Sequence, residues 1–289
     1  MTRPPYLTES AISQFITAAL AEDIGDGDHS TLGAIPTDLI RKAKLLVKDD
    51  GILAGVEMAG EIFYQVEPSL TLEYFKRDGD EIRNADIAFT VEGSARAILS
   101  AERLVLNCMQ RMSGIATYTR KLCKLIEGTG AQLMDTRKTT PNFRLMEKWA
   151  VAIGGGTNHR YALYDMVMLK DNHIDMAGGI PQAIENTKKY LTAKNKHLKI
   201  EVETRNLNEV QQVLNAGGVD VIMLDNMNVT DMKKAVTLIA GRCKTEASGG
   251  ITENNLRAVG ECGVDFISVG ALTHSTRSLD LSLKSINQL

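Results

Sequence analysis

Apolar residues in the second half of the chain fall into short runs that end in charged residues or glycine. Most runs are rich in Val, Ile, Leu and Met, which is typical of parallel strands buried on both faces. We expect six such strands, in the segments AQLMDT, DMVMLK, LKIEVE, VDVIMLD, KTEAS and VDFISVG. Their starts lie 20 to 34 residues apart, which leaves room for helical crossovers. Because a complete barrel has eight strands, the pattern predicts an irregular or incomplete α/β barrel.

The first part of the chain has a different pattern. Apolar residues at helical spacing mark residues 6–22, with Thr8 as a candidate cap, and the segment VEMAGEIFYQV. Short β-type runs flank the DDG and RDGD turns, so this part is a compact α+β module. We therefore expect an N-terminal domain at residues 1–115 and a barrel domain at residues 116–275. The C-terminal residues 276–289 are expected to pack back on the first domain.

Composition places the chain among ordinary globular proteins. Its 289 residues are 44% hydrophobic and 24% charged, which suits one large domain or two smaller ones. The net charge of −3 argues against a general nucleic-acid binder. We expect a cytoplasmic protein, because no apolar run could span a bilayer and the N-terminus has no apolar signal core. The cysteines form no CxxC pair, so we expect reduced structural thiols.

A basic segment lies within this acidic chain. From Arg103 to Lys170 there are 11 Lys and Arg against 4 acids, whereas the whole chain carries −3. Such a concentration suggests a site for a small, highly charged anion. The alternative is a solvated charged face of a helix. These cations argue against it, because they lie between strand-like runs and glycines and not along one helical stripe. His159 follows three glycines in GGGTNHR, and the absence of apolar neighbours favours contact with a ligand.

Glycine loops end the last two predicted strands. Barrel enzymes place their sites at the C-terminal ends of the strands, where late loops bind phosphate through backbone N–H groups. Ser248, Gly249 and Gly250 follow one strand, and the segment SVGAL contains Ser268 and Gly270. These loops are candidate phosphate sites, with tight-turn glycines as the other interpretation.

Two carboxylates are expected at the same barrel mouth. Glu201 and Glu203 alternate with apolar residues in LKIEVE, so both face one side of the strand. Asp225 ends the next strand and is the natural partner of Glu203. Carboxylates facing a phosphate loop suit Mg²⁺, which prefers oxygen ligands. Salt bridges to Lys138 or Lys170 are the alternative.

The cations of the basic segment suit anionic substrates. Arg103, Arg137 and Arg160 could each hold a carboxylate or phosphate in bidentate fashion. Lys138 and Lys170 are point charges, and either could form a Schiff base if its pKa were depressed. The residues therefore predict anionic substrates, at least one of them phosphorylated.

The stretch TRKTTPNFRLMEKWAVAIGGGTNHRYALYDMVMLKDNH closely resembles the quinolinate phosphoribosyltransferase family, whose other name is nicotinate-nucleotide pyrophosphorylase, carboxylating. The segments EDIGDGDHST, ERLVLNCMQRMSGIAT, IEVE, MLDN, EASGGI and SVGALTH match the same family in order, over nearly the whole chain. Asn142 stands where the family often has glycine, and Gly217-Gly218 resembles a one-residue extension. The resemblance implies an α/β fold, with an N-terminal α/β sandwich domain and an incomplete α/β barrel.

The resemblance also implies an activity. Members of this type II phosphoribosyltransferase family convert quinolinate and phosphoribosyl pyrophosphate into nicotinate mononucleotide, pyrophosphate and CO₂, with Mg²⁺, in de novo NAD biosynthesis. It further implies a homodimer in which Arg103 comes from the neighbouring subunit.

The matching motifs assign roles residue by residue. The expected catalytic residues are Lys138, Lys170, Glu203 and Asp225, of which Glu203 and Asp225 are also the expected Mg²⁺ ligands. The expected substrate-binding residues are Arg103, Arg137, Lys138, His159, Arg160, Lys170, Glu203, Asp225, Ser248, Gly249, Gly250, Ser268 and Gly270.

Three other functions compete with this one. A paralogue could act on another pyridine or aromatic acid such as nicotinate, but the dense cations favour a dicarboxylate. A Schiff-base aldolase could use Lys138 or Lys170. A non-catalytic sensor of phosphorylated metabolites is disfavoured by the two carboxylates. The acidic segment EDIGDGDHST lacks the offsets of a calcium-binding loop, and we expect a structural or interface role for it.

Overall fold

The structure is a computed structural model that describes residues 3–286. The described chain forms two compact units. The first unit comprises residues 3–120, 139–155 and 272–286, and the second comprises residues 121–138 and 156–271. Segment 139–155 was expected in the barrel domain, but it belongs to the first unit. The chain therefore passes between the units more often than a division after residue 115 predicts.

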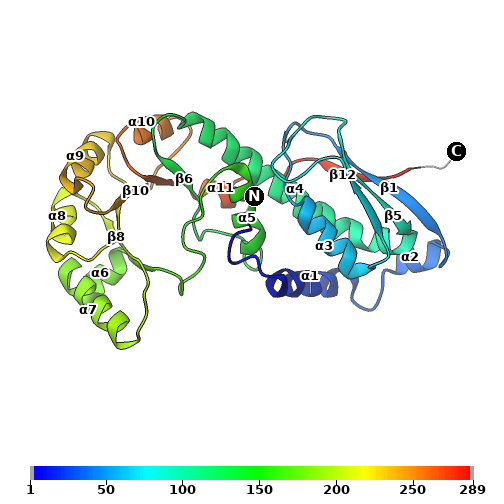
Figure 1. The fold of residues 1–289 in the computed structure, drawn as a ribbon, viewed down its shortest axis with the longest axis horizontal. Helices are drawn as coiled ribbons and strands as arrows, with labels where there is room; N and C mark the ends of the chain where they lie inside the picture. The colour runs from blue at the N-terminus through cyan, green and yellow to red at the C-terminus, as the bar shows by residue number, and fades with distance from the viewer. Residues whose placement is uncertain (1–2, 287–289) are drawn as a thin grey trace. The chain divides into compact units, whose positions relative to one another are not determined.

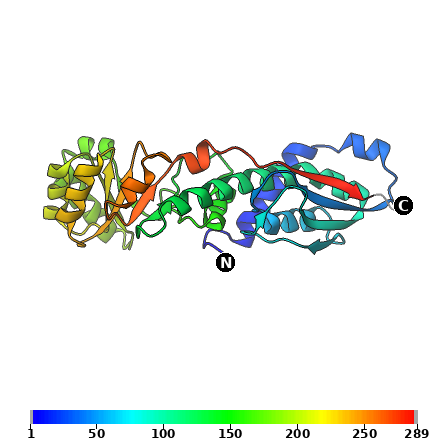
Figure 2. The ribbon, with the colours of Figure 1, turned by 90° about the horizontal axis from the view of Figure 1, so that it is seen from above.

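An antiparallel sheet lies in the first unit. Within residues 3–286 it has four strands, in the order β12 (Leu281–Ile286), β1 (Ile40–Val47), β5 (Ile87–Ser94) and β3 (Thr71–Tyr74). Figure 2 shows the last strand, β12, beside β1, with which it pairs from Leu281 opposite Val47 to Ile286 opposite Lys42. The short strands β2 (Gly51–Ile52) and β4 (Glu81–Ile82) form a separate pair. This arrangement is the antiparallel part of the expected sandwich.

The helices of the first unit are α1 (Glu9–Ile24), α2 (His29–Ala34), α3 (Val56–Val66), α4 (Ala95–Leu125, which continues into the second unit), α5 (Arg144–Gly154) and α11 (Ala271–His274). Two of them, α1 and α3, lie close to the predicted segments 6–22 and VEMAGEIFYQV. The expected cap is confirmed, because Oγ1 of Thr8 accepts the N–H of Ala11 at 3.1 Å. Phe63 of α3 and Phe89 of β5 are fully buried and meet edge to face, with ring centroids 6.1 Å apart. This contact packs α3 against the sheet.

The acidic segment before α2 serves the fold through Asp28. One of its carboxylate oxygens accepts the N–H of Thr31 at 3.0 Å and caps α2, and the other accepts the hydroxyl of Ser100 at 3.2 Å. Hydrogen bonds from Thr31 lower the pKa of Asp28. The carboxylate thus ties α2 to the long helix α4.

A parallel sheet forms the second unit. Its six strands within the described residues follow the order β6 (Gln132–Met134), β11 (Phe266–Ser268), β10 (Lys244–Ser248), β9 (Val221–Asp225), β8 (Ile200–Thr204) and β7 (Val167–Leu169). All six predicted strands are confirmed. In the described sheet β6 and β7 are the edges and do not pair with each other, so the barrel is incomplete, as expected.

Helices connect these strands on one side of the sheet. They are α6 (Asp171–Ala177), α7 (Ile180–Ala193), α8 (Leu207–Ala216), α9 (Val229–Ile239) and α10 (Leu256–Gly260). Figure 1 shows α7, α8 and α9 on the outer side of β8 and β10, which leaves the inner side of the strands to the site. No helix in residues 3–286 is both long and apolar enough to cross a membrane.

Candidate functional site

A pocket of about 540 Å³ opens at the C-terminal ends of the parallel strands. All six strands contribute to it, either by residues near their C-terminal ends or by the loops that follow, as the pattern of strand ends predicts. The lining residues are Thr136, Arg137, Lys138, His159, Arg160, Met168, Lys170, Glu203, Met223, Asp225, Asn226, Glu246, Ser248, Gly249, Gly250 and Ser268. The pocket lies entirely within the second unit.

Most of the residues proposed from the sequence meet in this pocket. They are Arg137, Lys138, His159, Arg160, Lys170, Glu203, Asp225, Ser248, Gly249, Gly250 and Ser268. Two proposed residues do not line it. Arg103 is exposed on α4 of the first unit, and Gly270 lies two residues beyond the end of β11.

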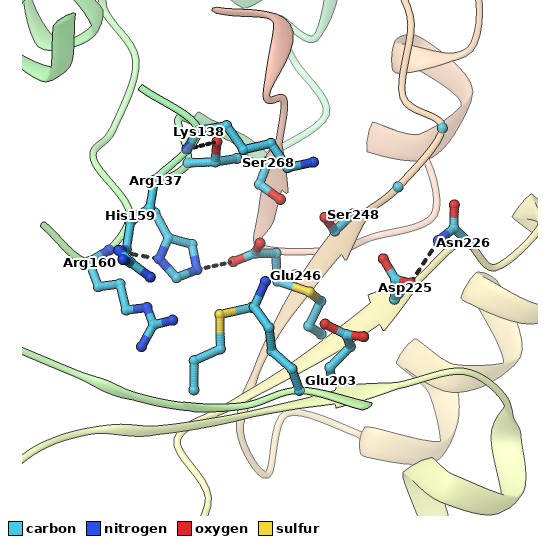
Figure 3. Close-up of a pocket in the computed structure, with 16 residues that line it drawn as sticks. Arg137, Lys138, His159, Arg160, Glu203, Asp225, Asn226, Glu246, Ser248 and Ser268 are labelled. Carbon is cyan, nitrogen blue, oxygen red and sulfur yellow. Dashed lines mark hydrogen bonds and ion pairs between the residues drawn. The ribbon is translucent and has the colours of Figure 1, made fainter. Parts of the chain in front are cut away.

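The pocket has a basic side and an acidic side. Figure 3 shows Arg137, His159 and Arg160 on one side and Glu203 and Asp225 on the other. Half-burial and the positive charge of Arg137 lower the pKa of Arg160, so the two guanidinium groups repel each other across the basic side. A bound anion would relieve that repulsion.

The loop that carries His159 and Arg160 is anchored on β6. Thr157 forms a parallel bridge with Met134, and its N–H donates to the carbonyl of Leu133 at 2.8 Å. The fully buried carboxylate of Asp135 accepts the N–H of His159 at 2.8 Å and the side-chain amide of Asn158 at 2.7 Å. Asp135 therefore fixes the position of Asn158 and His159 in the loop. The sequence pattern did not predict this role.

His159 reaches two buried glutamates. Its Nε2 lies 2.9 Å from Oε2 of Glu201 on β8 and 3.4 Å from Oε2 of Glu246 on β10. Burial alone would lower the pKa of His159, but hydrogen bonds to Glu201 and Glu246 raise it to about 10. Burial raises the pKa of Glu201 to about 7.

The position of the His159 proton follows from its contacts. Nδ1 accepts the N–H of Arg160 at 2.7 Å, which favours a neutral ring, whereas the two carboxylates favour the cation. In both states Nε2 carries a proton and faces Oε2 of Glu201 at 2.9 Å.

Glu203 and Asp225 form the acidic side. Burial and then the negative charge of Asp225 raise the pKa of Glu203, while the positive charge of Lys170 opposes this shift. The two carboxylates are thus close enough to repel each other, and they offer oxygen ligands to a divalent cation. The nearby charge of Lys170 supports the alternative of an ion pair as well.

A second group of side chains could also hold a metal ion. Within the described residues, His159, Glu201 and Glu246 offer three ligand atoms that lie within 4.8 Å of one another. The sequence placed Glu201 on the same strand face as Glu203 without a role of its own, and Glu246 was not a predicted site residue. The alternation of Glu246 with Ser248 on β10 matches that of Glu201 with Glu203 on β8, and could have indicated them.

The glycine loop after β10 contacts Asn226, which sequence reasoning also missed. Asn226 has φ +53, and its amide donates to Oδ2 of Asp225 at 2.7 Å. Gly249 and Gly250 have φ +82 and +62, which L side chains rarely adopt. The turn therefore requires these glycines, and phosphate binding by the loop stays a prediction.

Comparison with known proteins gives consistent matches. The quinolinate phosphoribosyl transferase N-terminal domain matches residues 28–113, and the C-terminal domain of the same family matches residues 115–284. The chain is 47% identical to the chloroplastic nicotinate-nucleotide pyrophosphorylase [carboxylating] of Arabidopsis thaliana, over 99% of this chain and 86% of the relative. It is 42% identical to the probable nicotinate-nucleotide pyrophosphorylase [carboxylating] of Bacillus subtilis, over 91% and 89% of the two chains.

Solved structures agree with these matches. The crystal structure of NadC from Streptococcus pyogenes superimposes with a TM-score of 0.91 at 37% identity. The superposition covers 99% of this chain and 100% of that one. The similarity therefore extends over both units and includes every residue that lines the pocket, within residues 115–284 of the C-terminal domain match.

Proposed function

This chain belongs to the quinolinate phosphoribosyltransferase family, and we propose that the pocket of its second unit carries out the family's reaction. The enzyme transfers the phosphoribosyl group of phosphoribosyl pyrophosphate to quinolinate with decarboxylation. The products are nicotinate mononucleotide, pyrophosphate and CO₂. This is the carboxylating nicotinate-nucleotide pyrophosphorylase step of de novo NAD biosynthesis.

The division of the pocket into a basic and an acidic side carries the proposal. The reaction joins a dianionic acid to a sugar carbon that becomes cationic when pyrophosphate leaves. The basic side with Arg137 and Arg160 suits the acid, and the acidic side with Glu203 and Asp225 suits the sugar carbon. Opposite charges on facing walls place the two reactants against each other before any bond changes.

Quinolinate binds on the basic side through its two carboxylates. Arg137 and Arg160 hold them with paired N–H donors, which also fixes the plane of the pyridine ring. The ring nitrogen then points at the anomeric carbon of the sugar and attacks it as the pyrophosphate bond breaks. No protein side chain acts as a nucleophile.

The charges that develop in this step have partners in the pocket. Positive charge on the ribose ring is stabilised by the carboxylates of Glu203 and Asp225. Lys138 and Lys170 neutralise negative charge on the departing pyrophosphate. Alkylation makes the pyridine nitrogen cationic, and this charge stabilises the carbanion that remains when the adjacent carboxylate leaves as CO₂. The carbanion then takes up a proton from water and gives nicotinate mononucleotide. Gly249 and Gly250, with Ser248, Ser268 and the neighbouring Gly270, receive the 5-phosphate.

Mg²⁺ is the cofactor that fits the acidic side. Glu203 and Asp225 would hold it, because their oxygens are hard ligands and their mutual repulsion is relieved by a cation. Bound there, Mg²⁺ supplies positive charge to the pyrophosphate.

The proposal extends to assembly and location. Arg103 is exposed on α4, so a second copy of the chain in a homodimer could bring its own Arg103 to the basic side. The cytoplasmic location stays a prediction, since relatives from Arabidopsis thaliana and Nicotiana tabacum are described as chloroplastic and mitochondrial.

A direct assay tests the function. Purified protein is mixed with quinolinate, phosphoribosyl pyrophosphate and Mg²⁺, and nicotinate mononucleotide and CO₂ are followed together. We expect equal release of both, and none when nicotinate replaces quinolinate. Product from nicotinate would favour the paralogue that acts on another acid. Borohydride trapping of an imine at Lys138 or Lys170 would favour the aldolase, and ligand binding without pyrophosphate release would favour the sensor.

A further inference from the structure

Two buried carboxylates lie beside His159: Glu246, which lines the pocket, and Glu201, which does not. Glu201 and Glu246 are 0% and 1% exposed, and they extend from β8 and β10 to the same histidine. Neither Oε1 of Glu201 nor Oε1 of Glu246 has a hydrogen-bond partner within the described residues. A buried carboxylate oxygen without a partner costs stability, and apolar side chains of similar volume would fill this space at lower cost. Stabilising the fold therefore does not explain the pair.

Both ring nitrogens of His159, which lies between the two glutamates, contact protein groups. Nε2 faces Glu201 and Glu246 at 2.9 Å and 3.4 Å, and Nδ1 accepts the backbone N–H of Arg160 at 2.7 Å. The ring thus connects the glutamates to the residue that follows it. Arg160 lines the pocket, and one of its guanidinium nitrogens donates to the carbonyl of Met166 at 3.2 Å.

We propose that Glu201 and Glu246 are positioning residues: they fix the His159 ring and, through its contact with Arg160, aim the Arg160 guanidinium at a carboxylate of the acid. The proposal rests on the proposed function and adds two residues to it. His159 then acts through Arg160, while Arg160 touches the substrate. Figure 3 shows this arrangement, with Glu246, His159 and Arg160 in succession along one wall of the pocket.

A double-mutant cycle tests the proposal. Glu201→Leu, His159→Ala and the double variant are assayed for kcat and for the KM of each substrate. Each single variant should raise the KM for quinolinate about tenfold, or about 1.4 kcal/mol, with the KM for phosphoribosyl pyrophosphate nearly unchanged. The double variant should raise the KM for quinolinate no more than the more severe single variant does, because both substitutions remove the same contact between Glu201 and His159. Glu201→Gln keeps an acceptor for Nε2 and should restore most of the loss.

Thr204→Val is the matched control. Thr204 is also buried on β8, and its hydroxyl donates to the carbonyl of Met223 at 2.8 Å, but it does not line the pocket. The control should lower the melting temperature without raising the KM for quinolinate selectively. If Glu201→Leu does not fold, Glu246→Leu takes its place in the cycle with a smaller expected effect, since its contact with His159 is longer.

Three results would overturn the proposal. One is additivity of the two substitutions, and another is an equal rise in KM for both substrates. The third is a transition metal bound stoichiometrically by the wild type and lost from Glu201→Leu, which would make these residues metal ligands. Wild-type protein that forms no nicotinate mononucleotide would overturn the proposed function itself, whereas normal wild-type turnover with an additive cycle overturns only the positioning role.

Discussion

Gly249 and Asn226 are packed so closely that a Cβ on Gly249 would lie 2.4 Å from Oδ1 of Asn226. Asn226 in turn holds Asp225, because its amide donates to Oδ2 of that carboxylate at 2.7 Å. The backbone N–H of Asn226 also donates to the carbonyl of Ser248 at 2.9 Å. The glycine loop and the acidic side of the pocket are therefore packed together through Asn226. A substitution in the loop should shift the position of the Asp225 carboxylate.

Gly249→Ala should weaken the enzyme more than Gly250→Ala. Both glycines have positive φ, which costs an alanine about 1 kcal/mol, but only the Cβ at Gly249 meets Asn226, since the nearest atom to a Cβ at Gly250 is 3.9 Å away. We expect Gly249→Ala to raise the KM for phosphoribosyl pyrophosphate at least about tenfold, or about 1.4 kcal/mol. Steady-state kinetics of the two variants provide the test, and equal effects would contradict a role for the Asn226 contact.

Arg137→Ala should cripple the use of quinolinate and leave the fold intact. Loss of a charge-assisted carboxylate contact costs about 1.5–3 kcal/mol, which corresponds to a KM for quinolinate raised about 10- to 150-fold. Arg83→Ala, which removes an exposed arginine away from the pocket, is the control. Kinetics and circular dichroism are measured on both, and wild-type turnover in Arg137→Ala would refute its assigned role.

Asp135→Asn should loosen the loop that carries His159. The carboxylate accepts the backbone N–H of His159 and the side-chain amide of Asn158, and an asparagine offers only one acceptor oxygen. We expect the free energy of unfolding to fall by about 1–3 kcal/mol, with a rise in the KM for quinolinate. Urea denaturation and kinetics are measured together. A destabilised variant with unchanged quinolinate affinity would show that the hydrogen bonds of Asp135 do not control the position of the loop for quinolinate binding.

The raised pKa of His159 predicts a pH-dependent stability. Its ordinary value is 6.5 and the carboxylates raise it to about 10, so the folded protein binds the proton more tightly than the unfolded chain does. This contribution is fully present below pH 6.5 and is lost as the pH rises toward 10. Compared with His159→Gln, the wild type should lose more stability over this range. Urea midpoints that stay parallel in the two proteins would show that the ring is neutral throughout.

Removal of divalent cations should stop turnover. EDTA is expected to abolish formation of nicotinate mononucleotide, and excess Mg²⁺ should restore it, because the acidic side offers oxygen ligands. Glu203→Gln and Asp225→Asn each remove one charge from that side and should raise the Mg²⁺ concentration needed for half-maximal rate. Activity that survives EDTA in the wild type would exclude Mg²⁺ as a required cofactor.

Much of the second unit followed from local pattern. The six strands were correctly placed from apolar runs, and the polar residues that end them meet in one pocket, because parallel strands bring their C-terminal ends to one edge. The glycine loop and the cations were found in the same way. These features depend on residues close in sequence, so a pattern of a few residues is enough to reveal them.

Other features depend on contacts between residues far apart in sequence. The pattern places Glu201 on the same face as Glu203, but only the fold shows that Glu201 and Glu246 share a buried histidine. Asn226 gains its role from a glycine 23 positions later, and Asp135 from a loop 23 and 24 positions later. The placement of segment 139–155 with the first unit is of the same kind.

Local pattern in the chain thus predicted the six parallel strands, two helices of the first unit, the family resemblance and the chemistry at the strand ends. The folded structure was needed to show which carboxylates are buried, which histidine nitrogen meets them and which glycine has no room for a side chain. The physical reason is that helix and strand formation respond to local periodicity, whereas burial, hydrogen-bond partners and shifted pKa values arise when distant segments exclude water together.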